Sequence, residues 1–114
     1  MKIVRLADEN GRVVCPRCAV ADNPWTRLRG LLGRGVLEPG EGLLIRPAGS
    51  VHTFFMRFAI DVVWLDRDLR VLDVRPNLQP WRMAGRRGAR AALELAAGEC
   101  ERVGLRAGDR LLAA

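Results

Sequence analysis

The sequence has few of the side chains that enzymes use as nucleophiles, general bases or metal ligands. Its 114 residues include one histidine (His52), one serine (Ser50) and three cysteines. These residues and the scattered acids give no convincing Ser-His-Asp or Cys-His arrangement, so an enzyme with a nucleophilic side chain is not expected. The odd number of cysteines excludes a framework in which every thiol is paired within the chain, and reduced thiols are the simpler interpretation.

Long apolar runs are also missing. No stretch approaches the roughly 20 apolar residues that a membrane-spanning helix needs, and MKIVRLADENGR lacks the apolar segment of a secretory signal. A cytoplasmic location is therefore expected, or an envelope location if a leader was removed. The apolar content of 49% and charged content of 28% are those of an ordinary globular chain, and the length predicts a single domain, 1–114.

Lysine is almost absent from a strongly basic chain. The formal net charge is +6, and Lys2 is the one lysine among 19 basic residues. Most arginines are spread singly, but Arg82, Arg86, Arg87 and Arg90 cluster in WRMAGRRGAR. Such a loop can neutralise phosphates without reading a base sequence. Because no helix-turn-helix pattern or aromatic platform accompanies it, specific nucleic-acid binding is not expected.

Short β-prone runs and turn signals dominate the chain. KIVRL and RVVC flank Asn10-Gly11 and predict an opening hairpin. IDVVWLD (60–66) is apolar on both faces, which predicts a central strand, and the short link after it predicts an antiparallel neighbour at 69–76. Further strands are expected at LLI, VHTFFMRF and ARAALEL, and RAGDRLL predicts a turn into a last strand.

Helical signals are confined to two segments. Asp22 or Asn23 can cap a helix that has Pro24 in its first turn, which predicts one main helix over about 24–33. Gly30 inside this pattern implies that another backbone passes close to it. AGECERVGL predicts a short C-terminal helix. Together these elements predict a β-dominated α+β domain whose mostly antiparallel sheet curls into a small barrel.

Four motifs occur in a fixed order between Ala21 and Leu112: RLRGLLGR, GEGLLIRP, HTFFMRFAIDVVWLD and ALELAAGECERVGLRAGDRL. Their combination resembles the bacterial and archaeal family called domain of unknown function 192. The resemblance implies a compact β-rich fold built around the aromatic-methionine motif, and it implies no established activity. Many relatives carry a leader peptide, so the family does not fix a location for this chain.

The chain departs from the family pattern at two places. Members often have FWM where this chain has Phe54, Phe55 and Met56, and Asp-Gly in the hairpin where it has Asp68-Leu69. A left-handed leucine is unfavourable by about 1 kcal/mol or more. The turn between the two hairpin strands is therefore expected to be of another type.

The segment HTFFMR holds the first candidate site. If it is extended, His52, Phe54 and Met56 share one face of a strand. His52 and Met56 can then bind a soft metal such as Cu(I), or line an apolar pocket closed by the histidine. Alternatively, the phenylalanine and methionine fill the core and the histidine hydrogen-bonds to backbone at the strand's mouth.

Charged residues near this segment are further candidates. Arg57 and Asp61 are separated by FAI, which suits a bend in which Asp61 accepts backbone N–H groups and Arg57 pairs with Asp61 or Glu94. In the functional alternative, Arg57 is the fork that holds a carboxylate or phosphate. Glu94 is alone in the apolar ALELA, where a solvent-exposed face is the default and a polar group reaching into the pocket is the alternative.

The motif CPRC places Cys15 and Cys18 at a spacing that suits a zinc corner or a redox pair. Zinc needs four ligands, and Cys100 and His52 are the remaining soft donors. A redox pair normally sits where a helix begins, whereas this motif has an extended context. Two ordinary thiols are therefore the simpler interpretation.

The sequence thus supports two functional hypotheses. The first is a noncatalytic binding or accessory domain with a pocket around His52, Met56 and Arg57, and with Glu94 near it, for an anionic or apolar ligand or a partner protein. The alternative is a metal-dependent or redox protein that uses Cys15 and Cys18, with zinc or copper as the metal. No cofactor is firmly expected.

Overall fold

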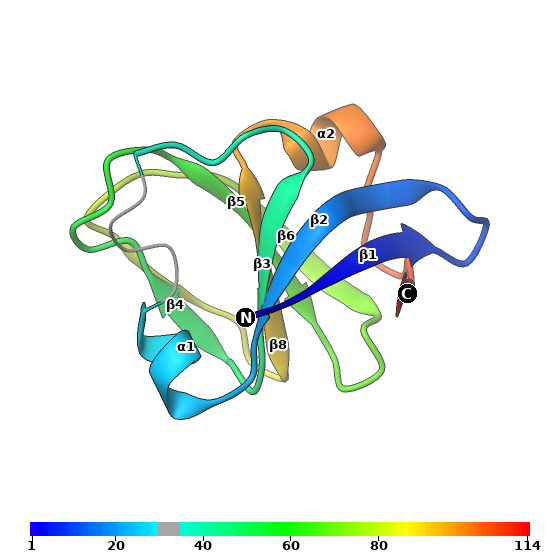
Figure 1. Ribbon diagram of the computed structural model, residues 1–114, viewed down its shortest axis with the longest axis horizontal. Helices are drawn as coiled ribbons and strands as arrows, with labels where there is room; N and C mark the ends of the chain where they lie inside the picture. The colour runs from blue at the N-terminus through cyan, green and yellow to red at the C-terminus, as the bar shows by residue number, and fades with distance from the viewer. Residues whose placement is uncertain (30–34) are drawn as a thin grey trace.

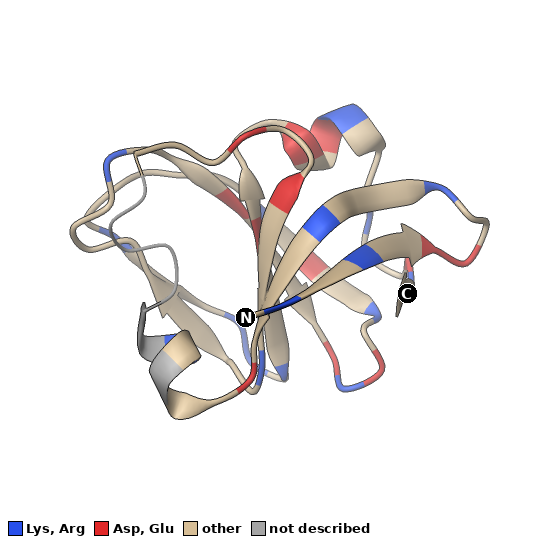
Figure 2. Ribbon diagram, in the orientation of Figure 1, with Lys and Arg blue, Asp and Glu red and all other residues tan. Residues whose placement is uncertain are grey.

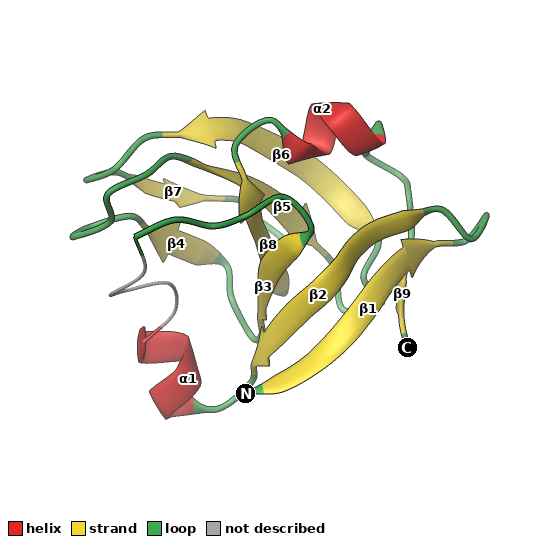
Figure 3. Ribbon diagram, turned by 45° about the horizontal axis from the view of Figure 1, so that its top comes forward, coloured by secondary structure: helices red, strands yellow, loops and turns green. Residues whose placement is uncertain are grey.

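A curled β-sheet forms the body of the molecule, which the computed structural model describes over residues 1–29 and 35–114. Seven strands of the described chain follow one another in the order β6-β5-β8-β3-β2-β1-β9, and the sheet curls into a half-barrel (Figures 1 and 3). These strands are β1 (Lys2–Asp8), β2 (Val13–Ala21), β3 (Glu41–Ile45), β5 (Ile60–Leu65), β6 (Val71–Leu78), β8 (Ala91–Ala96) and β9 (Leu111–Ala113).

A two-stranded ribbon lies at one end of the half-barrel, opposite the end where β1 and β9 meet (Figure 3). It consists of β4 (Ser50–His52) and β7 (Met83–Gly85), which pair antiparallel. The strand predicted over VHTFFMRF therefore stops at His52, and residues 53–59 form turns. The prediction of one extended segment is wrong because Thr53 bonds to a distant loop, as described below.

Two short helices accompany the strands in the described ranges. α1 (Pro24–Arg29) begins at the predicted proline, and the side chain of Asn23 accepts a hydrogen bond from Thr26 N at 3.0 Å. The rest of the predicted helix, including Gly30, lies outside the described residues. α2 (Glu99–Val103) falls within the predicted C-terminal segment. With helices of six and five residues, the chain is mostly β, which corrects the α+β class and confirms β dominance.

The predicted hairpins are present. β1 pairs antiparallel with β2, and Asp8 Oδ1 accepts the backbone N–H groups of Asn10 and Arg12 at 2.9 Å each, which closes the turn. β5 is buried at all six positions and lies between β6 and β8, both antiparallel to it. The predicted burial on both faces and the predicted antiparallel neighbour are confirmed, whereas β5 is an interior strand second from the edge of the sheet and not its central strand.

The β5–β6 turn contradicts one prediction. The sequence predicts a turn in which Leu69 is not left-handed, but Leu69 adopts a left-handed conformation with φ of 63°. Two features offset the strain: Asp66 Oδ1 accepts the N–H groups of Asp68 and Arg70 at 2.8 and 2.9 Å, and the Leu69 side chain is buried in the core. The turn therefore keeps the left-handed geometry without glycine.

One parallel pair makes the sheet mixed. β2 pairs parallel with β3, with Cys18 opposite Gly42, whereas every other strand pairing in the described chain is antiparallel. Gly42 leaves no room for a side chain, because a Cβ there would lie 2.8 Å from both Cys15 Sγ and a Leu95 methyl carbon. Close approach of β2, β3 and β8 thus depends on glycine at this position.

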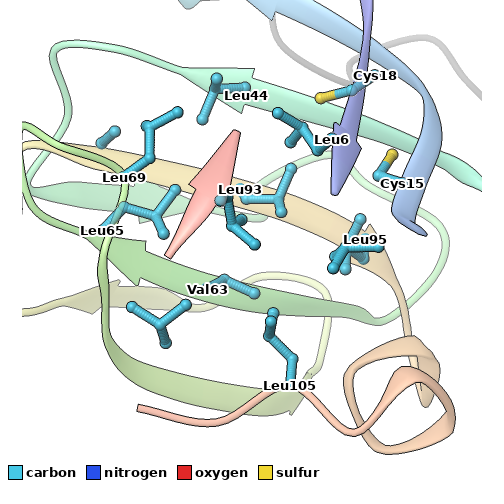
Figure 4. Packing of buried hydrophobic residues seen from close by; sticks show 14 of the residues in the cluster. Leu6, Cys15, Cys18, Leu44, Val63, Leu65, Leu69, Leu93, Leu95 and Leu105 are labelled. Carbon is cyan, nitrogen blue, oxygen red and sulfur yellow. The ribbon is translucent and has the colours of Figure 1, made fainter. Parts of the chain in front are cut away.

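Two buried clusters lie on opposite faces of β5 and β8. The first core fills the inside of the curl, where Leu6, Leu44, Leu93 and Leu95 converge (Figure 4). The second core includes Trp64 and covers the other face of the same strands. Both faces of these strands are therefore buried. None of the helices in residues 1–29 and 35–114 has the length and apolar character needed to cross a membrane.

Candidate functional site

A group of four aromatic side chains and one methionine gathers where β4 ends and β7 begins. We call His52, Phe54, Phe55, Trp81 and Met83 the aromatic patch. Ring centroids are 5.0 Å apart for His52 and Phe54, 6.1 Å for Phe54 and Trp81, and 4.7 Å for Phe55 and Trp81. Met83 joins them because it pairs with His52 across the ribbon.

The patch is open to solvent. Phe55 is 71% exposed, Trp81 55% and Met83 71%. Large apolar side chains on a soluble protein are expected singly, whereas contiguous ones mark interaction surfaces or ligand grooves. The aromatic patch is therefore the best candidate for a binding surface on the described part of the chain.

Thr53 holds the two turns that carry the patch. It is fully buried, and its hydroxyl donates to Gln79 O at 2.6 Å while accepting from Arg82 N at 2.9 Å. Its backbone N–H donates to Arg82 O at 2.8 Å, and its carbonyl accepts from Trp81 N at 2.9 Å. The side chain and the backbone N–H and C=O groups of one residue thus fasten the turn after β4 to the loop before β7.

Backbone strain accompanies the exposed rings. Phe55 and Trp81 both adopt left-handed conformations, with φ of 66° and 64°. Such conformations are rare for residues other than glycine and cost on the order of 1 kcal/mol each. Strain of this kind persists where the surrounding structure enforces it, as Thr53 does here, and it clusters at functional sites.

The residues of the predicted pocket separate into different environments. His52 is exposed, and its Nδ1 accepts the Phe54 N–H at 3.3 Å, so the expected hydrogen bond between this histidine and the backbone is present. Met56 is buried in the second core at 6% exposure. Arg57 is exposed, and no hydrogen bond or ion pair joins its guanidinium to another residue of the described chain.

Asp61 is a structural acceptor. Its side chain is buried, with Oδ1 accepting Asn77 N at 2.9 Å and Oδ2 accepting Gly98 N at 3.1 Å and Cys100 N at 3.0 Å. The expectation that it binds backbone N–H groups is confirmed, although the donors come from β6 and α2 and not from the adjacent bend. Arg57 does not pair with it.

Glu94 corrects the expectation of a solvent-exposed face. It lies between Leu43 and Val62 on neighbouring strands, on the face covered by the second core, and is 3% exposed. No hydrogen bond or ion pair reaches its carboxyl group from the described residues. Burial raises the pKa of Glu94 to about 7.

Cys15 and Cys18 lie in the first core and are fully buried (Figure 4). Their thiols donate weakly to Gly40 O at 3.6 Å and Ala19 O at 3.5 Å. Interaction with Cys18 lowers the pKa of Cys15, whereas interaction with Cys15 and burial raise that of Cys18. Among the described residues, no three His, Cys, Asp or Glu side chains gather as a metal would require, so this geometry adds no third ligand to the pair.

The burial of the thiols leads to a labelling prediction. Cys15, Cys18 and Cys100 are 0%, 0% and 4% exposed, and burial raises the pKa of Cys100 to about 12. We expect dithiobis(nitrobenzoate) to leave all three unmodified in the native protein and to react with all three after unfolding in guanidinium chloride. Rapid reaction of any thiol in the folded protein would contradict the buried arrangement.

The members of the arginine cluster lie in different surroundings. Arg86 pairs with Asp73 at 3.6 Å and donates to Arg87 O at 2.7 Å. Arg82 follows Trp81 and lies beside the aromatic patch.

Trp81 and Met83 were not predicted as site residues. They lie in a segment with the composition of an ordinary loop, and this segment reaches Thr53 through backbone groups that are distant from Thr53 in the sequence.

The fold and surface together define a mostly β half-barrel domain whose most distinctive exposed feature is aromatic. The family model DUF192, described as "Uncharacterized ACR", matches residues 5–113. The chain belongs to this family of uncharacterised proteins, as its motifs predicted.

Two curated relatives and one solved structure are similar to this chain. A UPF0127 protein of Thermococcus sibiricus is 31% identical over 110 residues, which cover 89% of this chain and 68% of the relative. Another UPF0127 protein, from Pyrococcus furiosus, is 39% identical over 95 residues, covering 80% and 81% of the two chains. A crystal structure from Sinorhizobium meliloti, of a protein for which a role as a transcription regulator has been suggested, has a TM-score of 0.84 at 25% identity and covers 97% and 92%.

Proposed function

We propose that the chain is a noncatalytic binding module that holds a partner protein through the aromatic patch. The observation that carries this proposal is the contact of Phe55 with Trp81. Both rings are mostly exposed, and both residues adopt a strained left-handed backbone conformation. Tryptophan and arginine supply much of the binding free energy in protein interfaces. The proposal retains His52 and Arg57 from the site expected from the sequence, and it includes Trp81 and Met83 in place of the buried Met56.

Ring geometry favours a protein partner over a nucleic acid. His52 stacks on Phe54, and Phe54 on Trp81, with interplanar angles of 28° and 29°. Each of these rings thus has another ring beside one of its faces, whereas stacking of nucleic-acid bases needs free ring faces. The outer edges of the rings and the Met83 side chain suit apolar side chains of a protein.

Charge favours acidic groups in the partner. Arg57 and Arg82 are exposed and follow the two turns that carry the patch, and the chain as a whole has a net charge of +6. Rim charges of this kind select partners of opposite sign and accelerate association. The expected partner surface is therefore apolar at its centre with Asp or Glu around it.

A library of random peptides displayed on phage tests this function. We expect selection on the immobilised protein to enrich peptides that combine aromatic or aliphatic residues with acidic ones. The variant Phe55→Gly/Trp81→Gly should weaken a selected peptide by about 30-fold or more, as for interface hot spots. Glycine accepts both left-handed conformations, so the variant should remain folded.

The control is Ile3→Ala, which removes a side chain that is 63% exposed on β1 and lies outside the patch. It should leave peptide affinity unchanged. Equal binding by the double glycine variant would refute the assignment of the surface. A different result would assign the patch to nucleic acid: the selection yields no peptide, and the protein binds a labelled single-stranded oligonucleotide that the double glycine variant does not bind.

A further inference from the structure

A second charged feature shares no residue with the aromatic patch. It is an open hollow of about 260 Å³ lined by Arg46, Arg67, Arg90, Asp66, Pro47 and Ala91. The strand ends and the β5–β6 turn that supply these residues lie along the lower edge of Figure 2. Three guanidinium groups and one carboxylate give the lining charges of +3 and −1, a net charge of +2.

Backbone hydrogen bonds bring the three arginines together from separate segments. Arg90 N donates to Leu65 O at 2.8 Å, at the end of β5 next to the turn that carries Arg67. Arg90 O accepts Ala48 N at 3.0 Å, from the loop that begins at Arg46. These backbone hydrogen bonds therefore hold the three segments that carry the arginines next to one another, and the arginine side chains are exposed.

The guanidinium groups of the hollow have no partners within the described part of the chain. No hydrogen bond or ion pair joins the side chain of Arg46, Arg67 or Arg90 to another described residue. Arg12 and Arg102, by contrast, lie 3.0 and 2.6 Å from carboxylate oxygens, whereas Arg57 and Arg75 resemble the arginines of the hollow in having no such partner in the described chain. The hollow thus holds unneutralised charge.

Asp66 does not offset this charge fully. Its Oδ1 already accepts the N–H groups of Asp68 and Arg70, which close the β5–β6 turn. Each guanidinium, by contrast, presents a planar fork of donors that matches phosphate oxygens. We infer that the hollow binds a phosphoryl group carrying more than one negative charge, as in a small soluble diphosphate.

Calorimetric titration with inorganic pyrophosphate tests the site. We expect one pyrophosphate per chain at low salt, with affinity reduced about tenfold or more in Arg67→Gln and in Arg90→Gln, since each removes charge-assisted hydrogen bonds. Arg90→Lys should recover only part of the affinity, because it restores the charge without the fork. The melting temperature should stay unchanged, since these side chains have no partners to lose.

Arg75→Gln is the matched control. Arg75 lies on β6 outside the hollow, is exposed and has no side-chain partner in the described ranges. An equal loss of affinity in Arg75→Gln would overturn the site. Absence of binding both to pyrophosphate and to the vesicles described next would also overturn it.

A second arm identifies the source of the phosphoryl group. Phosphatidylcholine vesicles containing phosphatidic acid are titrated with the same variants. Binding of pyrophosphate that Arg67→Gln and Arg90→Gln abolish supports a soluble phosphorylated compound. Binding to vesicles alone, lost in the same two variants and kept in Arg75→Gln, supports the site with a lipid headgroup as its ligand.

Discussion

Replacing Asp61 by alanine should destabilise the protein by about 3–5 kcal/mol, because three backbone N–H groups lose their acceptor. Cys100 N is buried and cannot turn to water. The carboxylate also fastens β5 to the start of α2 and to Asn77 on β6. Urea denaturation followed by tryptophan fluorescence measures the loss, and the melting temperature should fall by roughly 10–20 °C.

Asp73→Ala is the control for this measurement. The Asp73 side chain is 60% exposed. Its carboxylate accepts a hydrogen bond from the N–H group of the next residue, Val74, and forms an ion pair with Arg86 at 3.6 Å. An exposed pair of this kind contributes about 1 kcal/mol at most. If Asp61→Ala cost no more than Asp73→Ala, the three bonds to Asp61 would contribute little to stability.

Glu94 should make the protein less stable as the pH rises from about 4.5 to about 7. The unfolded chain ionises this residue at its ordinary pKa of 4.5, whereas the folded protein retains the proton until its raised pKa of about 7. Between these values the folded state binds more protons, so the free energy of unfolding falls with pH. The total loss is about 3 kcal/mol, complete above the folded pKa.

Glu94→Gln isolates this contribution. The amide has nearly the same shape and no charge, so the variant should match the wild type near pH 4.5 and be about 3 kcal/mol more stable at pH 8. Urea titrations of both proteins at several pH values give the difference, in which the other carboxyl groups cancel. A difference that does not change with pH would mean that Glu94 ionises normally in the folded protein.

Some elements could be predicted because their signals are local. The run Ile60–Leu65 is apolar on both faces, and its burial at every position follows directly. The opening hairpin likewise depends on the Asn10-Gly11 turn between its strands. The burial of Glu94 could also have been predicted. Ala92 and Ala96, which lie on the same face of β8, are apolar, and this pattern indicates a covered face.

Other features depend on contacts between distant parts of the chain. The segment after His52 alternates like a strand, but Thr53 bonds to residues 79–82 and turns the chain instead. Leu69 is unfavourable in its conformation when considered alone, and burial of its side chain offsets that cost. The aromatic patch was therefore not predicted, because Trp81 reaches Phe55 only through the Thr53 contacts.

The pairing of β1 with β9 has a consequence for the order in which the chain can fold on the ribosome. Leu6 lies opposite Ala113, and Arg5 and Ala114 exchange backbone hydrogen bonds at 2.9 and 3.1 Å. β1 is synthesised before β9, so its outer edge stays open until β9 has emerged from the ribosome. During translation that edge is free to pair with other nascent strands, so the exposed charges of Lys2 and Arg5 protect the chain when it is most vulnerable.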